Sequence, residues 1–170
     1  MAWTLVLGGA RSGKSAYARR EAEAAPRRGR LVMIATAEAH DSEMAERIAR
    51  HRAERDAAWA TLEAPRDLAG AVCGLAPDDV AVVDCLTLWL SNLMLDEADV
   101  GANLARLASA LSASPARLLV VSNEVGQGIV PDNALARRFR DEAGFMHQRL
   151  AAAADRVVLV VAGLPLVLKG

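Results

Sequence analysis

The sequence predicts an α/β fold in which a mostly parallel sheet carries helices on both faces. Short apolar runs alternate with longer segments of helical character along the 170 residues. This order is typical of parallel strands that are connected through helices. The runs are apolar throughout instead of alternating with polar residues, which is typical of strands that are covered on both faces. The length suits one full-sized core, so we expect residues 1–170 to form a single domain.

Six apolar runs are predicted as strands, and the spaces between them as helices. The predicted strands cover residues 3–7, 31–35, 80–83, 118–121 and 157–161, with a sixth candidate at 164–168. The predicted helices cover residues 14–24, 42–59, 86–95, 103–111 and 134–154. The last helix has the clearest pattern, because Leu135, Phe139, Met146 and Leu150 lie on one stripe with Ala143 between them.

A glycine-rich segment between the first strand and the first helix has the pattern G-x-x-x-x-G-K-S. It consists of Gly8, Gly9, Ala10, Arg11, Ser12, Gly13, Lys14 and Ser15. Its glycines let backbone N–H groups point at phosphate oxygens, and the following helix adds the positive end of its dipole. We expect Lys14 to reach the terminal phosphates and Ser15 to hold Mg²⁺. The motif predicts a P-loop NTPase-like, RecA-like nucleotide-binding domain; the alternative is a chance match in a glycine turn.

Two further segments follow predicted strands. Asp84 ends the third strand, where an acid can bind Mg²⁺ directly or through water; the alternatives are a helix N-cap and a plain loop acid. Residues 122–131 follow the fourth strand and contain two glycines. Ligands bind at this edge of open α/β sheets, but an ordinary surface loop fits the pattern equally well.

A charged helix is predicted after the second strand. Its residues Glu43, Arg47 and His51 are spaced i, i+4, i+8 and share one face, and Arg52 and Arg55 come next. Neighbouring arginines favour the neutral, nucleophilic imidazole. On spacing alone, however, a solvated surface residue is the more usual interpretation of such a histidine.

Charge and hydropathy exclude several classes of protein. The net charge is −1, so nucleic acid is not expected as a partner. The longest apolar stretch, residues 157–168, is too short to span a bilayer and is interrupted by Gly163 and Pro165. The chain enters its first strand at once, so we expect a cytoplasmic protein. Cys73 and Cys85 make neither a disulfide framework nor a zinc site, and Cys85 is predicted to be buried.

The motifs together resemble the bifunctional adenosylcobinamide kinase / adenosylcobinamide-phosphate guanylyltransferase family of cobalamin synthesis. The matching positions are residues 8–15, 34–37, 41–44, 47, 48, 51, 52, 55, 59, 63, 84–93, 123–131, 133, 136, 137, 139–141, 144 and 160–163. The P-loop alone is generic. The blocks 84–93 and 123–131 are much more specific, and their order along the chain agrees.

The resemblance implies two reactions. A nucleoside triphosphate, ATP or GTP, phosphorylates the aminopropanol hydroxyl of adenosylcobinamide. GTP then donates GMP to that phosphate, which gives adenosylcobinamide-GDP and pyrophosphate. In the family the GMP passes through a phosphoramidate on histidine, and His51 matches that position.

The resemblance also suggests roles for other residues. Glu63 is a candidate for recognising guanine, and Arg52 and Arg55 are candidates for contacting the phosphates or the ribose. The backbone of Thr36, Ala37 and Glu38, just past the second strand, is placed where it could touch the nucleotide.

Two further expectations come from the resemblance. His147 stands where the family has asparagine, which predicts a helix-surface or interface residue and not a second nucleophile. The family forms trimers, so a homotrimer is expected.

Two other functions share part of this pattern. A GTPase switch would need Asp-x-x-Gly after the third strand and Asn-Lys-x-Asp for guanine, whereas Asp84 leads into Cys85-Leu86-Thr87. A P-loop small-molecule kinase without guanylyl transfer is the nearer alternative, but it leaves His51 and the loop from Asn123 without a role.

Overall fold

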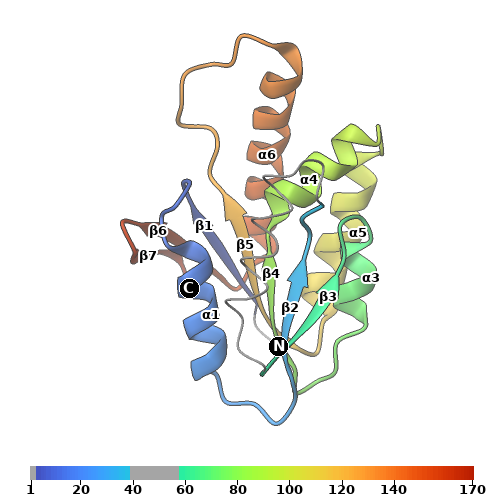
Figure 1. Cartoon of the computed structure of the whole chain (residues 1–170), viewed down its shortest axis with the longest axis vertical. Helices are drawn as coiled ribbons and strands as arrows, with labels where there is room; N and C mark the ends of the chain where they lie inside the picture. Colours follow the sequence, from blue (N-terminus) through green and yellow to red (C-terminus); the bar gives the residue numbers. More distant parts are fainter. Residues whose placement is uncertain (1–2, 39–57) are drawn as a thin grey trace.

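The computed structural model describes residues 3–38 and 58–170, and a seven-stranded sheet forms its centre (Figure 1). The strands are β1 (Trp3–Gly8), β2 (Leu31–Ala35), β3 (Trp59–Glu63), β4 (Val80–Asp84), β5 (Arg117–Asn123), β6 (Arg156–Val161) and β7 (Leu164–Lys169). They lie in the order β3-β2-β4-β5-β1-β6-β7, and every neighbouring pair is parallel except β6 and β7. The mostly parallel α/β fold predicted from the sequence is confirmed.

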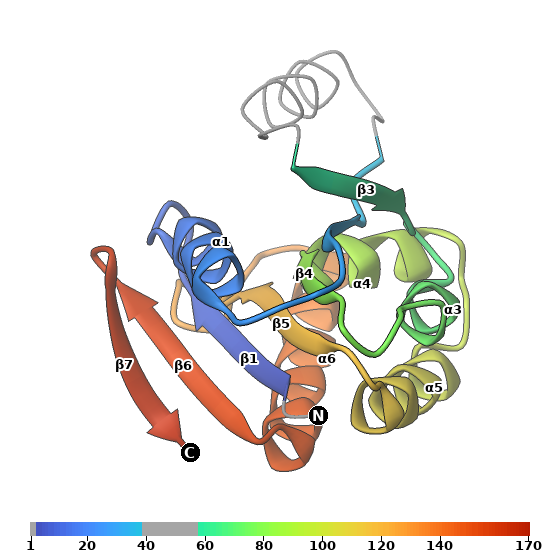
Figure 2. The same ribbon diagram turned by 90° about the horizontal axis from the view of Figure 1, so that it is seen from below.

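Helices cover both faces of the sheet, as Figure 2 shows. The described helices are α1 (Lys14–Ala24), α3 (Leu68–Cys73), α4 (Leu86–Leu95), α5 (Val100–Ala113) and α6 (Ala134–Ala153). Helix α1 packs on one face, where Tyr17 and Ala18 meet strand residues such as Val82. Helices α3 to α6 pack on the other, where Trp89 and Leu107 meet the opposite side of the same strands. The central strands are therefore apolar on both faces.

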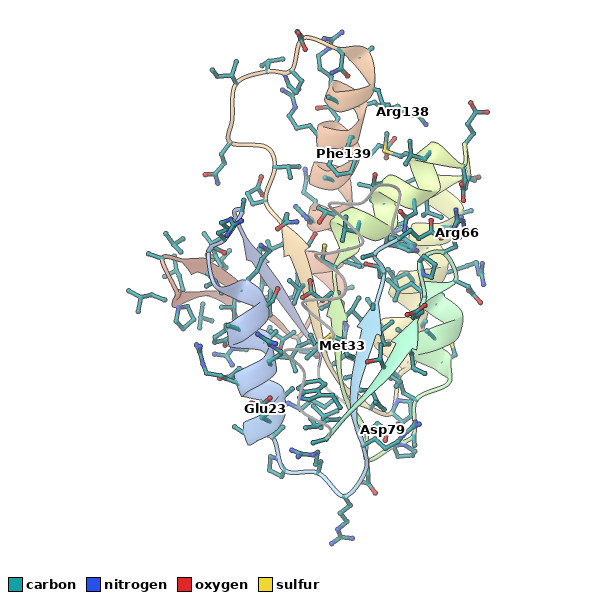
Figure 3. All side chains as sticks on the ribbon, in the orientation of Figure 1. Glu23, Met33, Arg66, Asp79, Arg138 and Phe139 are labelled. Atoms are coloured by element: carbon teal, nitrogen blue, oxygen red, sulfur yellow. The ribbon has the colours of Figure 1, made fainter. Side chains whose placement is uncertain are left out.

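The amino ends of β2 and β4 are joined by a buried carboxylate. Asp79 accepts hydrogen bonds from the Arg30 guanidinium at 2.7 Å and from the Ala76 backbone N–H at 3.0 Å. The Arg30 contact is the main cause that lowers the pKa of Asp79 to about 2. Figure 3 places Asp79 at the end of the sheet opposite to Arg66, so this pair stabilises the fold away from the P-loop.

The prediction for residues 42–59 was wrong at its C-terminal end. Trp59 does not end a helix; it begins β3, which pairs with β2 in parallel. The indole Nε1 of Trp59 donates to Glu23 of α1 at 3.2 Å. The rest of the predicted helix lies outside the described residues. The short helix α3 was not predicted either.

Several predicted elements needed smaller corrections. Helix α5 begins at Val100, earlier than predicted, because the Asp99 carboxylate caps it by accepting from Ala102 N–H at 2.9 Å. In α6, Leu135 lies on the exposed side, with 56% of its surface exposed, whereas Ala143, Met146 and Leu150 are buried as predicted. Strand β7 is not covered on both faces, because all of its residues are exposed at the edge of the sheet.

Candidate nucleotide-binding site

The P-loop leaves β1 at the centre of the sheet, between β5 and β6. Gly8 is buried there, and a Cβ added to it would lie 2.4 Å from Ser12 Oγ and 2.7 Å from the carbonyl oxygen of Val160. Gly13 then adopts a φ of 92° and begins α1 without a side-chain cap. The first N–H groups of α1 therefore keep their capacity to bind an anion, as a phosphate site requires.

Lys14 and Ser15 follow at the first turn of α1. The Lys14 side chain is buried, and its ammonium donates to the carbonyl oxygen of Gly9 at 3.0 Å. This places the ammonium inside the curve of the loop. Ser15 is half-buried in the same turn. The positions of both side chains fit a loop that surrounds phosphate groups.

The turn between β6 and β7 supports the P-loop from behind. Gly163 N–H donates to the carbonyl oxygen of Ser12 at 2.8 Å. A Cβ on Gly13 would come within 3.1 Å of Gly163 Cα, so two glycines allow the backbones to approach. No role was predicted for Gly163; its place between the two predicted strands 157–161 and 164–168 was the signal available.

The carboxyl ends of the strands bring the predicted site residues to one edge of the sheet. Ala35 pairs with Glu63 on one side and with Asp84 on the other, so β3, β2 and β4 end at the same level. Gly8 pairs with Asn123 of β5. The structure thus places the P-loop, Asp84, Glu63 and the residues after β2 along a common edge.

Hydrogen bonds of Thr36 connect the end of β2 to the end of β4. Its buried hydroxyl donates to Cys85 O at 2.7 Å and accepts from Cys85 N–H at 2.9 Å. Asn92 of α4, also buried, donates from Nδ2 to Thr36 O at 2.8 Å and to Pro65 O at 3.0 Å. These bonds fix the position of Asp84, because it directly precedes Cys85. The role of the Thr36 side chain is therefore to hold the ends of the two strands together.

Glu38 and Arg66 form a second connection at this edge. Arg66 makes ion pairs with Glu38 and with Asp96 at the end of α4. The pKa of Arg66 is raised, first by the hydrogen bond with Asp96 and then by that with Glu38. Trp89 Nε1 donates to Arg66 O at 2.8 Å, so α4 also holds the chain that follows β3.

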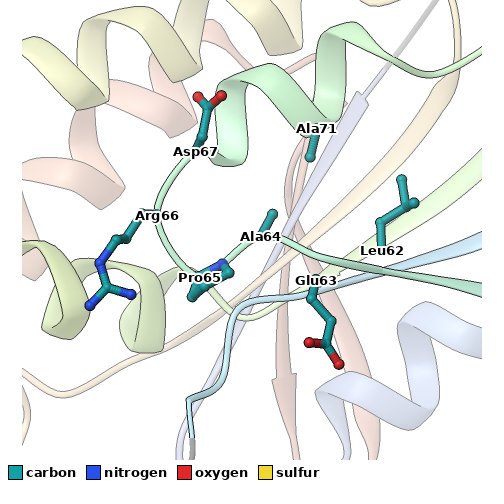
Figure 4. Close-up of a pocket in the computed structure, with 7 residues that line it drawn as sticks. All are labelled: Leu62, Glu63, Ala64, Pro65, Arg66, Asp67 and Ala71. Carbon is teal, nitrogen blue, oxygen red and sulfur yellow. The ribbon is translucent and has the colours of Figure 1, made fainter.

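A hollow of about 440 Å³ lies beside the end of β3 (Figure 4). It is lined by Leu62, Glu63, Ala64, Pro65, Arg66, Asp67 and Ala71. Figure 4 shows the carboxylates of Glu63 and Asp67 directed to different sides of the chain. Glu63 is exposed, so its carboxylate is accessible from solvent at the edge where β3 ends.

The end of β5 is held by a buried histidine. His147 of α6 shares a hydrogen bond of 2.7 Å between Nε2 and Ser122 Oγ, and its Nδ1 lies 3.7 Å from Glu124 Oε2. The prediction of a helix-surface or interface residue was wrong, because only 7% of His147 is exposed. Its spacing of four residues from Ala143 was the signal for burial. Burial lowers the pKa of His147, and the Glu124 carboxylate opposes this shift.

Three of the predicted site residues, His51, Arg52 and Arg55, lie outside the described residues, as do Glu43 and Arg47. Nothing structural is therefore added to the predictions made for them.

The hydroxyl of Ser15 and the carboxylate of Asp84 are oxygen ligands of the kind that Mg²⁺ prefers. Ser15 is the last residue of the P-loop and Asp84 ends β4, so both lie at the same edge of the sheet. Among residues 3–38 and 58–170, no three His, Cys, Asp or Glu residues gather as a metal cluster. This arrangement fits an ion that takes its other ligands from phosphate groups and water.

Comparison with known proteins decides the family. The model of the cobinamide kinase / cobinamide phosphate guanyltransferase family matches residues 4–168. The chain belongs to this family. The bifunctional adenosylcobalamin biosynthesis protein CobP of Pseudomonas aeruginosa is 49% identical over 98% of this chain and 96% of its own length. The corresponding protein CobU of Salmonella typhimurium is 42% identical over 97% of this chain and 98% of its own length.

Solved structures agree on the fold. An ATPase from a bacterial type III secretion system superposes with a TM-score of 0.62 at 10% identity, over 93% of this chain and 50% of that one. A KaiC-like protein of Pyrococcus horikoshii gives a TM-score of 0.51 at 13% identity, over 93% of this chain and 70% of that one. These likenesses show a P-loop NTPase fold, as the sequence predicted.

Family membership makes the chain a bifunctional enzyme, and the plain small-molecule kinase is not favoured. Within the described part of the chain, no helix combines the length and the apolar character needed to cross a membrane.

Proposed function

We propose that a single domain, residues 1–170, phosphorylates adenosylcobinamide and then transfers GMP from GTP to the new phosphate. The observation that carries the proposal is a P-loop at the same carboxyl edge of the sheet as Asp84, in a chain of the cobinamide kinase / guanyltransferase family. The products of the second step are adenosylcobinamide-GDP and pyrophosphate. Either ATP or GTP serves as the phosphate donor in the first step.

In the kinase step, the backbone from Gly8 to Ser15 binds the phosphates of the donor. Lys14 lies inside the loop, where its ammonium can move from the Gly9 carbonyl to the terminal phosphates. Ser15 and Asp84 would hold Mg²⁺, which supplies positive charge to the transferring phosphoryl group. The buried bonds of Thr36 keep Asp84 at the level of the P-loop.

In the guanylyl step, neutral His51 acts as the nucleophile. An imidazole nitrogen forms a bond to the α-phosphorus of GTP, the bond to the bridging oxygen breaks, and pyrophosphate leaves with the electron pair. A phosphate oxygen of adenosylcobinamide phosphate then attacks the same phosphorus and releases the histidine. The P-loop amides and Lys14 stabilise the charge on the leaving phosphates.

Guanine recognition falls to Glu63. A carboxylate can accept from both N1–H and the 2-amino group of guanine. Its exposed position at the end of β3, beside the hollow, supports this role. Arg52 and Arg55 would contact the phosphates or the ribose. The backbone of Ala37 and Glu38 would touch the nucleotide, whereas the predicted contact of Thr36 does not fit, because Thr36 is buried and its N–H and carbonyl oxygen are bonded to Asp84 and Asn92.

We further propose a homotrimer. Exposed apolar residues on the β6–β7 hairpin support self-association, because large apolar side chains at an unpaired sheet edge favour contact with another chain. They are Val161, Leu164, Leu166, Val167 and Leu168.

Product analysis with two variants tests the proposal. Wild-type protein with adenosylcobinamide, GTP and Mg²⁺ is expected to form first the phosphate and then adenosylcobinamide-GDP. Lys14→Ala should lose both products, whereas His51→Ala should accumulate adenosylcobinamide phosphate. Formation of adenosylcobinamide-GDP by His51→Ala at the wild-type rate would exclude the histidine route.

A further inference from the structure

The loop that joins β5 to α6, residues 124–133, presents three apolar side chains to solvent: Val125 near its start, and Ile129 and Val130 at its tip. Ile129 has 98% of its surface exposed and Val130 has 61%. We propose that this apolar tip contacts the corrin ring of the acceptor and so determines acceptor binding. The inference rests on the proposed function, because it concerns the acceptor of that reaction.

The loop begins in direct contact with the P-loop. Asn123, the last residue of β5, pairs with Gly8, and Glu124 N–H donates to Gly8 O at 2.9 Å. Figure 1 shows the chain rising from this end of β5 before it reaches α6. An acceptor must approach the phosphates that the P-loop holds, so this loop is well placed to meet it.

Both ends of the loop are anchored. Glu124 Oε1 accepts from Gly126 N–H at 2.6 Å, while its Oε2 faces His147. At the other end, Arg137 Nη1 donates to Pro131 O at 2.9 Å and to Asp132 O at 2.8 Å. Among the described residues, none donates to or accepts from residues 127–130. The structure thus holds the base of the loop and leaves the tip to contact a ligand.

The chemistry of the tip fits the acceptor better than the donor. Residues 125–131 carry no charged side chain, whereas phosphate groups are bound by cations and backbone N–H groups. A corrin ring carries methyl groups and neutral amide arms on its rim. Ile129 and Val130 suit the methyl groups, and the Gln127 side chain can exchange hydrogen bonds with the amides.

The β6–β7 hairpin provides the larger apolar surface for contact between copies of the chain. Its strand β7 is exposed along its whole length at the edge of the sheet. The loop tip, in contrast, is a short segment that starts at the P-loop. We therefore assign the binding of the acceptor to the tip. A contact of the tip with another subunit is one of the outcomes that the experiment below can reveal.

The experiment uses the double variant Ile129→Ser with Val130→Ser in the kinase assay. The expected result is a KM for adenosylcobinamide raised by about tenfold or more, because apolar contacts in a binding site contribute factors of this size. The KM for the nucleotide should stay within about twofold of wild type, since such uncharged residues do not bind phosphate. Ile129→Leu, which keeps an apolar contact, should retain the wild-type KM for the acceptor.

Phe145→Ser is the matched control. Phe145 is 64% exposed, close to the value for Val130, but it lies on the solvent side of α6, whereas the adjacent Met146 and His147 are buried. Its substitution should leave both KM values at the wild-type level.

Three outcomes would overturn the inference: an unchanged KM for adenosylcobinamide, an equal rise in both KM values, or a change in oligomeric state measured by light scattering. The last would make the tip a contact between subunits. A wild-type protein that does not phosphorylate adenosylcobinamide would refute the proposed function itself. An active wild type with an unaffected double variant would refute only the role of the tip.

Discussion

Gly8 lies where β1 turns into the P-loop, and its missing side chain is what allows the turn to pack. A Cβ would meet the Val160 carbonyl oxygen at 2.7 Å, and this backbone atom belongs to the neighbouring β6. Gly8→Ala should therefore displace the loop and raise the Kd for nucleotide by about tenfold or more, which corresponds to about 1.4 kcal/mol. Titration calorimetry measures this directly.

The control for that variant is Gly144→Ala. A Cβ at Gly144 meets no atom within 4 Å, and the position lies inside α6. This variant should bind nucleotide normally and gain a little stability, because alanine favours helices over glycine. Equal affinities for nucleotide in the wild type and in Gly8→Ala would contradict the packing argument.

His147 predicts a pH dependence of stability. Burial lowers its folded-state pKa below the ordinary value of 6.5, so the unfolded chain takes up a proton at a higher pH than the folded chain does. The contribution of neutral His147 to stability is therefore fully present above about pH 6.5. As the pH drops below this value, the free energy of unfolding falls by up to about 1.4 kcal/mol per pH unit. Urea unfolding of wild type and His147→Asn between pH 5 and 8 measures the difference. Parallel curves for the two proteins would show that His147 does not contribute.

At the scale of elements, α4 holds the ends of β2 and β3 together. Asn92→Leu would leave the carbonyl groups of Thr36 and Pro65 without their donor. We expect a loss of about 1–3 kcal/mol in unfolding free energy for such buried unpaired groups. A raised KM for nucleotide should accompany the loss, because the segment after β2 would shift.

A second variant on the same helix separates the two effects. Leu95→Ser changes an exposed residue at the end of α4 and should leave both quantities near wild type. If Asn92→Leu lowers stability but keeps the wild-type KM for nucleotide, α4 stabilises the fold without positioning the nucleotide site.

The elements also show what the sequence could predict. The apolar runs of β2 and β4 and the spacing of the P-loop are local patterns, so the central strands and the first helix were found at their correct places. Strand β3 was missed because Trp59–Glu63 mixes buried, half-buried and exposed residues and directly follows a charged segment.

The connections of the site could not be predicted in this way. Thr36 and Cys85 are 49 residues apart in the chain, and Asn92 lies 56 residues from Thr36. No local pattern encodes such contacts, because they form only when the sheet brings distant strand ends together. The apolar runs therefore predicted that the P-loop, residues 36–38 and Asp84 follow strand ends, but not which side chains hold these ends together.

At the scale of the whole molecule, the exposed apolar side chains of β7 predict that copies of the chain assemble. Leu164 and Leu166 lie on one face of the strand, Leu168 stands at an irregularity in the pairing of β7 with β6, and between 55% and 72% of each is exposed. Leu166→Asp with Leu168→Asp should convert the expected trimer to monomer at the same protein concentration, because the charges would have to be buried in the contact. Light scattering gives the masses. A variant that keeps the wild-type mass would place the interface elsewhere.

The intact mass of the protein after incubation with GTP and Mg²⁺, without acceptor, tests the guanylyltransferase mechanism most directly. The account predicts the gain of one GMP per chain, stable in alkali, labile in acid and lost in His51→Ala. An unmodified mass, from protein that still phosphorylates adenosylcobinamide, would contradict the covalent mechanism and leave a P-loop kinase.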